Sequence, residues 1–169
     1  IMIRTLILVF SFAYFVNRSA SFGDVSLAAN HILLQLISFA AFFLDGYAFV
    51  VESLVGSAMG SKQNKMFDSA VKKSTILAAC TALILAVALW VFGGFIIARL
   101  TDISAVRFEA AQFLPLASAY IFLSFAAFQL DGIFIGASQT KEIRNAMIVS
   151  VLSFIAISIY LTRYFENHG

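Results

Sequence analysis

Long apolar runs separated by short charged clusters make up most of the chain. A bilayer core of about 30 Å is crossed by about 20 mostly apolar helical residues, so we divided the chain at its charged clusters to find membrane spans. Five spans are predicted, at roughly 4–21, 27–59, 70–98, 108–137 and 146–163. Barrel strands would alternate apolar and polar residues over about ten positions, and these runs are too long and too continuous for that. The pattern therefore predicts an all-α integral membrane protein, a polytopic helical bundle.

The second and fourth runs are longer than a minimal span. Helices of that length are expected to tilt, to kink or to project beyond the hydrocarbon. Pro115 is the only proline of the chain and lies early in the fourth run. We expect it either to kink that helix or to mark where the helix starts.

Composition supports the assignment to the membrane. Of the 169 residues, 62% are hydrophobic and 12% are charged, and the mean hydropathy is +0.96. Average soluble domains are about 45–50% apolar and about 25% charged. The net charge of +2 is too small to indicate nucleic-acid binding, and the single cysteine, Cys80, excludes an internal disulfide. We expect no cofactor.

The charges between the spans predict an orientation. Seven basic residues fall on one side and four on the other, and the richer side is expected to be cytoplasmic. The segment 60–73, GSKQNKMFDSAVKK, supplies most of this difference. We interpret it as a solvated cytoplasmic loop followed by the start of a helix. A phosphate or anionic-lipid site in this segment is a weaker alternative.

A nonapeptide occurs twice with one mismatch: SFAAFFLDG at 38–46 and SFAAFQLDG at 124–132. Each copy places an aspartate, Asp45 or Asp131, inside an apolar run. A charge at the centre of a membrane helix costs about 2.5–3.5 kcal/mol on insertion scales, so each carboxylate must be protonated, paired or in water. A functional role is favoured over a structural one for both residues.

Further polar residues share a helical face with these aspartates. In the second span the face includes His31, Gln35, Ser38, Asp45 and Glu52. Glu52 could equally extend to the cytoplasmic interface, and His31 is favoured as a hydrogen-bonded interfacial residue. In the fourth span Tyr120, Ser124 and Asp131 share a face, with Gln129 beside them, and Asn17 and Asn30 lie near the outer ends of the first two spans. The candidate substrate-binding or ion-binding residues are Asp131, Asp45, Asn17, Glu52, Gln35, Tyr120 and Gln129.

Two glycine pairs are spaced for close helix packing. Gly56 with Gly60, and Gly132 with Gly136, both form G-x-x-x-G motifs. Such pairs let the backbones of neighbouring membrane helices approach closely.

Longer motifs resemble a known family. The runs SLAANHILLQLISFAAFFLDGYAFVVESLVGSAMGSK and LPLASAYIFLSFAAFQLDGIFIGASQTKEIRNAM are similar to the carboxy-terminal lobe of MATE (multidrug and toxic compound extrusion) transporters of the DinF-like branch. The resemblance implies a twelve-helix protein of two six-helix lobes, which exports organic cations or other amphipathic compounds against an inward flow of protons or sodium ions. Residues 1–169 would then be helices seven to eleven, without the amino-terminal lobe and the last helix. The implied location is the bacterial inner (plasma) membrane, and the implied partners are the lipid bilayer, small cationic substrates and the amino-terminal lobe.

The resemblance also assigns residues. Asp131 matches the cation-coupling acid of the tenth helix in sodium-coupled members, which makes it a candidate sodium ligand. Those members also carry an acid on the seventh helix, but the span 4–21 contains none, and Asn17 is its most polar interior candidate. The proton-linked aspartate of the DinF-like branch belongs to the first helix, outside this chain, so the coupling ion stays open. Between the two lobes we expect a wet central cavity lined by Asp45 and Asp131. The aromatic residues that could line it, although most could equally face lipid, are Phe39, Phe42, Phe43, Tyr47, Phe125 and Phe128.

Two other functional classes stay as alternatives. A non-transporting helical scaffold or receptor segment would need no paired acids. An intramembrane aspartyl protease would use two aspartates to activate water, but the sequence has no G-x-G-D motif and no Tyr-Asp pair. Both copies of the nonapeptide instead read L-D-G, and we do not expect an enzyme.

Overall fold

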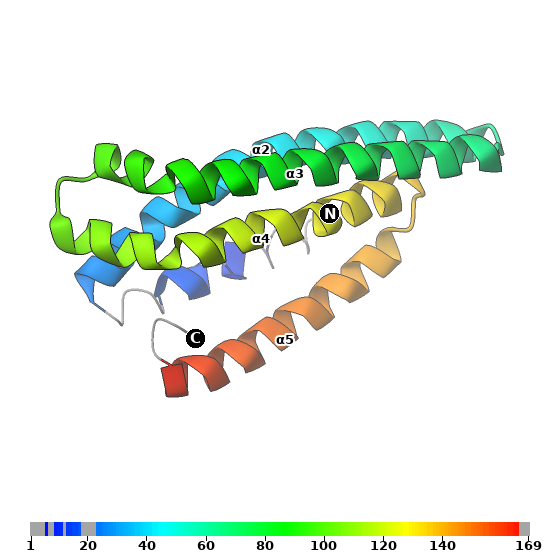
Figure 1. Cartoon of the computed structure of the whole chain (residues 1–169). Helices are drawn as coiled ribbons and strands as arrows, with labels where there is room; N and C mark the ends of the chain where they lie inside the picture. The colour runs from blue at the N-terminus through cyan, green and yellow to red at the C-terminus, as the bar shows by residue number, and fades with distance from the viewer. Residues whose placement is uncertain (1–5, 7–8, 12, 18–22, 166–169) are drawn as a thin grey trace.

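The computed structural model describes residues 6, 9–11, 13–17 and 23–165, and this part of the chain is helical apart from short turns. Residues 9–11 and 13–17 belong to helix near the start of the chain. Four long helices follow (Figure 1): α2 (Asp24–Gly60), α3 (Asn64–Leu100), α4 (Ser104–Gly136) and α5 (Thr140–Phe165).

The helices agree with the predicted spans. The second to fifth predicted spans each correspond to one helix, α2 to α5, and differ from it by at most six residues at either end. Within the described residues, α2, α3 and α4 are long and apolar enough to cross a membrane. Most of the first predicted span lies outside the described residues. The prediction of an all-α membrane bundle is confirmed.

The helices α2, α3 and α4 form the packed part of the molecule. Ala48 of α2 lies against Gly132 of α4, and Glu52 lies against Gly136, so these two helices run parallel. The short turns place α3 antiparallel to both (Figure 1). Helix α5 leaves α4 at their shared turn and diverges from it, with few contacts along its length.

Small side chains fill the interfaces between these helices. Many of the buried residues are alanines, among them Ala29, Ala82 and Ala110, which are fully buried. In a membrane, helices associate through van der Waals packing and hydrogen bonds, and small residues let the backbones approach. The core therefore depends on close backbone contact more than on large interlocking side chains.

The closest approach occurs at the glycines of α4. A Cβ atom added to Gly132 would overlap the carbonyl oxygen of Ala48, and one added to Gly136 would lie 2.5 Å from the carbonyl oxygen of Glu52. The predicted packing role of this pair is confirmed. The other pair fits only in part, because Gly56 lies against α4 whereas nothing lies within 4 Å of a Cβ added to Gly60.

The turns at the lysine-rich end of the bundle share one geometry. Lys62 and Ser138 have positive φ angles of 54° and 60°. The next residue in each turn donates its backbone N–H to the carbonyl five residues earlier, from Gln63 to Ala58 and from Gln139 to Phe134. This left-handed cap ends a helix within one residue and lets the next begin almost at once.

The tight turn corrects the predicted boundary of the loop at 60–73. Only Ser61, Lys62 and Gln63 lie between α2 and α3, since α3 begins at Asn64. The lysines of this segment beyond Lys62 therefore lie on the first turns of a helix. Pro115 lies inside α4, which begins at Ser104, so the proline does not mark the start of the helix.

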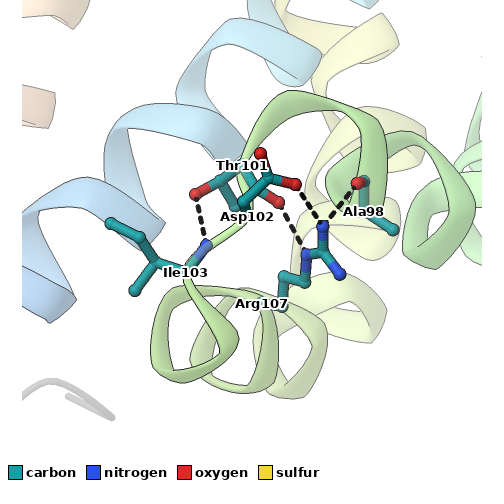
Figure 2. A network of polar contacts seen from close by, with 5 residues as sticks. All are labelled: Ala98, Thr101, Asp102, Ile103 and Arg107. Atoms are coloured by element: carbon teal, nitrogen blue, oxygen red, sulfur yellow. Dashed lines mark hydrogen bonds and ion pairs between the residues drawn. The ribbon is translucent and has the colours of Figure 1, made fainter.

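An arginine organises the opposite turn, between α3 and α4 (Figure 2). Arg107 Nε donates to the Thr101 carbonyl at 2.6 Å, and Nη2 donates to the Ala98 carbonyl at 2.9 Å and to Asp102 Oδ1 at 3.0 Å. The last carbonyls of a helix lack partners within the helix and carry partial negative charge. Arg107 therefore caps the end of α3 from the first turn of α4.

We predict that Gly132→Ala destabilises the packing of α2 against α4. The new methyl group would overlap the backbone at Ala48, and overpacking of this kind costs about 1–3 kcal/mol. Thermal unfolding in detergent should show a lower midpoint. The matched control is Gly94→Ala, because nothing lies within 4 Å of a Cβ at Gly94 and alanine favours helix. Equal midpoints for the two variants would contradict the close approach.

We also predict that Arg107→Ala lowers the free energy of unfolding by about 1–2 kcal/mol. Charge-assisted hydrogen bonds contribute about 1.5–3 kcal/mol, and less where solvent reaches them. The control is Arg99→Ala, because Arg99 has a cation–π contact with Phe95 of its own helix, 5.2 Å from the ring centroid. The same unfolding measurement applies. A larger loss in Arg99→Ala than in Arg107→Ala would count against the capping role.

Candidate functional site

Polar residues of α2 form a stripe on one face of the helix, as predicted. His31, Gln35, Ser38 and Asp45 are exposed, and Glu52 is half-buried. We call these five residues the polar stripe. The opposite face of α2 packs against α3 and α4 through Leu33, Ala40, Leu44, Ala48, Val51 and Val55.

One end of the polar stripe borders a cavity. The cavity measures about 380 Å³ and lies between residues 13–17 and the first turns of α2, where His31 and Asn30 contribute to its wall beside Phe15. The Gln35 side-chain nitrogen lies 3.5 Å from His31 Nε2. This hollow is mostly apolar, with polar groups along its α2 side.

The two aspartates of the repeated nonapeptide both face away from α3. Tyr47 bonds to Thr81 of α3, with 2.8 Å between the two hydroxyl oxygens. Gln129 Oε1 accepts a hydrogen bond of 3.2 Å from Ser74 Oγ, also on α3. Asp45 and Asp131 are each two positions from one of these residues, which is about 200° around the helix axis. Both aspartates therefore lie on the side of the α2–α4 pair opposite α3, which we call the aspartate side.

The aspartates also lie at nearly the same depth. Gly132 is 84 positions beyond its contact Ala48, and Asp131 is 86 positions beyond Asp45. Since α2 and α4 are parallel, the two aspartates differ in depth by about two residues, or about 3 Å along the axis. Asp45 is exposed and Asp131 is half-buried. The repeated nonapeptide thus places two carboxylates level with each other on neighbouring helices.

The other predicted site residues do not all lie on the aspartate side. Glu52 is seven positions beyond Asp45 and belongs to the same stripe. Tyr120 is 58% exposed. Ser124, on the same face of α4, donates its hydroxyl to the Ile121 carbonyl of its own helix at 2.8 Å. Asn17 is exposed on the first helical segment.

Gln129, which the sequence analysis placed beside the Asp131 face as a candidate site residue, lies on the α3 side of α4. Its side chain is 2% exposed and lies between α3 and α4, where it pairs with Ser74. Gln129 is two positions before Asp131, which is about 200° around the helix axis, so the two side chains point to opposite sides of α4. Tyr47, expected to line the cavity, likewise points to α3.

One polar pair was missed in the sequence. Ser26 of α2 donates a hydrogen bond to Glu109 of α4, near the end of the bundle where Arg107 lies. Ser26 is buried and Glu109 half-buried. The sequence did contain a signal for this pair, because Glu109 is an acidic residue within the predicted span 108–137. The pair supports the parallel register, because Glu109 is 83 positions beyond Ser26.

A sodium site at Asp131 stays a prediction. Among the residues that the structure describes, no group of three or more His, Cys, Asp and Glu side chains lies together.

Comparison with known proteins identifies the family. The family model MatE matches residues 1–162. The chain belongs to the MatE family. It is 30% identical over 175 residues to the DNA damage-inducible protein F of Escherichia coli K12, an alignment that covers all of this chain and 37% of that protein. No solved structure matches the chain.

The MatE match and the similarity to DNA damage-inducible protein F together confirm the resemblance to the DinF-like branch of MATE transporters. Together with the three long apolar helices, it identifies an integral membrane protein. The chain spans about 37% of the length of its MatE relative from Escherichia coli.

Proposed function

We propose that this chain is part of a cation-coupled multidrug exporter, in which a proton or sodium ion moves inward as an organic cation or amphipathic compound moves outward. Membership of the MatE family and similarity to the Escherichia coli relative support transport over a scaffold or a protease. The observation that carries the proposal is the placement of Asp45 and Asp131 at nearly the same depth on the aspartate side.

The carboxylates on the aspartate side would be costly if lipid covered that side. A charged side chain at the centre of a membrane helix costs about 2.5–3.5 kcal/mol when it meets lipid. The polar stripe of α2 presents four exposed polar residues, including Asp45, on one face of a helix that is long and apolar enough to cross a membrane. We infer that the aspartate side faces a water-filled cavity, which a second lobe closes. In this arrangement the chain supplies helices seven to eleven of a twelve-helix protein.

Competition for a carboxylate couples the two flows. A negative group in the cavity binds a proton, a sodium ion or a cationic substrate, and the binding of one displaces another. Alternating access by rocking of two lobes then exposes the occupied site to each side of the membrane in turn. Asp131 is the coupling site in this proposal, and Asp45 attracts cationic substrates.

Aromatic residues next to Asp45 suit an organic cation. Phe42 and Phe49 lie three positions before and four positions after Asp45, so they are its neighbours on the helix surface. They are 76% and 66% exposed. Aromatic faces attract cations at distances up to about 6 Å. The sequence analysis named Phe42 among the residues that could line the cavity. Phe49 was not named there, and its position one turn beyond Asp45 makes it a further candidate.

We predict that the turn between α2 and α3 is cytoplasmic, in the bacterial inner membrane. A cysteine introduced by Gln63→Cys, with Cys80 replaced by serine, should be shielded from impermeant thiol reagents in intact cells and become reactive after lysis. Gln63 suits the test because its side chain makes no capping hydrogen bond. Ready labelling from outside would reverse the orientation.

We predict that Asp131→Asn abolishes export by the complete transporter, because asparagine keeps the size of the side chain but cannot carry a charge. Asp45→Asn should raise the KM for cationic substrates about tenfold, as expected for loss of an interaction worth about 1.5 kcal/mol. Both variants should reach the membrane in normal amounts. The measurement is uptake of a fluorescent organic cation into everted vesicles, driven in separate runs by a proton gradient and by a sodium gradient.

Asp68→Asn is the matched control, because Asp68 is an exposed aspartate at the lysine-rich end of α3. It should transport normally. If the coupling ion is the proton, as the lack of an acid in the span 4–21 favours, export should persist without sodium. Wild-type export by Asp131→Asn would remove the basis of the coupling role and favour a structural carboxylate.

A further inference from the structure

A second hollow lies away from the aspartate side, between α2 and α3. It is a groove of about 370 Å³, and we call it the α2–α3 groove. Its apolar wall includes Val50 and Leu54 of α2 and Leu77 of α3, and Lys73 and Ser69 of α3 line it as well. Val50, Leu54 and Leu77 are 52%, 39% and 56% exposed, so the groove is open to its surroundings.

The groove and the polar stripe lie on different faces of α2. Leu54 is two positions beyond Glu52, and Tyr47, at the deep end of the groove, is two positions beyond Asp45. Two positions correspond to about 200° around the helix. The groove therefore opens away from the aspartate side, and an occupant of it does not depend on the transport function proposed above.

The lining of the groove changes from polar to apolar at the expected depth of the membrane surface. Residues 75–98 of α3 contain no charged side chain, and at a rise of about 1.5 Å per residue they span about 36 Å, enough to cross a bilayer core. Lys73 precedes this stretch, so its ammonium group lies at the level of the lipid headgroups. Leu77 lies one turn deeper, at the level of the acyl chains.

Positive charge is concentrated at this end of the groove. The segment 61–74 contains four lysines and one aspartate. Lys62, Lys65 and Lys72 are exposed near Lys73. Basic residues beside a membrane surface attract anionic lipids by about 1 kcal/mol each. The groove therefore combines an apolar trough with a cationic mouth, which is the complement of an anionic amphiphile.

We propose that the α2–α3 groove binds a phospholipid with an anionic headgroup. Its phosphate accepts hydrogen bonds from the Lys73 ammonium and the Ser69 hydroxyl, and one acyl chain lies along Leu77, Leu54 and Val50. An apolar helix in the same trough would leave Lys73 without an anionic partner, whereas an anionic lipid headgroup supplies one. This site recognises the headgroup charge, so a zwitterionic lipid should bind more weakly.

The test measures lipid preference beside the groove in the complete protein. Leu77→Trp serves as the reporter after every other tryptophan, including Trp90, is replaced by phenylalanine. The protein is reconstituted in phosphatidylcholine bilayers with increasing fractions of brominated phosphatidylglycerol, which quenches tryptophan on contact. We expect phosphatidylglycerol to bind more tightly than phosphatidylcholine, and Lys73→Gln to reduce this preference about fivefold, the factor that corresponds to the loss of about 1 kcal/mol.

Lys72→Gln is the matched control. Lys72 is the adjacent, exposed lysine and does not line the groove. Its replacement should change the preference less than twofold. Equal losses in the two variants would mean diffuse surface attraction and overturn the site. A lack of quenching even at the highest fraction of brominated phosphatidylglycerol would mean that a protein segment covers Leu77, which also overturns the proposal.

A second measurement avoids the tryptophan reporter. Native mass spectrometry of the complete protein with its natural tryptophans should retain phosphatidylglycerol in the Lys72→Gln variant and lose it in Lys73→Gln. Equal retention by both variants would contradict the role of Lys73 even if Leu77→Trp perturbs the groove.

Discussion

The backbone contact between α2 and α4 determines the arrangement of the rest of the molecule. Gly132 and Gly136 bring α4 against the carbonyl oxygens of Ala48 and Glu52, at distances that no larger residue permits. This contact sets both the parallel direction and the register of the two helices. Because the register is set, the two copies of the nonapeptide lie side by side, and their aspartates become level. The site is thus a consequence of helix packing by small residues.

Polar side chains in the bundle fall into two groups with different energetics. Three pairs join polar side chains across helix interfaces, Ser26 with Glu109, Tyr47 with Thr81 and Ser74 with Gln129, whereas the buried Ser118 hydroxyl makes no hydrogen bond within the described residues. Such pairs replace water that the membrane does not supply, at a gain of about 0.6–2 kcal/mol each. The polar stripe of α2 lies outside these interfaces, so packing among α2, α3 and α4 does not account for it, whereas the water-filled cavity proposed above would.

Periodicity and length were sufficient to predict the helices, because a membrane allows few alternatives to a helix in a long apolar run. The close packing at Gly132 and Gly136 could also be predicted, because two glycines four positions apart let membrane helices approach closely. The face of an individual side chain was harder to predict. Gln129 was placed beside the Asp131 face and Tyr47 among the aromatic residues that could line the cavity, but each points to α3, and only the position of α3 decides this. The start of α3 within the segment 60–73 depended on the left-handed turn at Lys62. This turn was not predicted because the residue with positive φ is a lysine and not a glycine.

Three faces of α2 have different surroundings: the polar stripe, the contact with α4 and the α2–α3 groove. These differences limit how the helix can move. Residues two positions apart, such as Asp45 and Tyr47 or Glu52 and Leu54, have opposite surroundings. A rotation of α2 by half a turn would exchange carboxylates with apolar side chains and expose charge to lipid at a cost of about 2.5–3.5 kcal/mol for each. The glycine contacts with α4 oppose such a rotation because they fit one face of α2 only. Conformational change in this part of the protein is therefore expected to move α2, α3 and α4 together as one rigid unit.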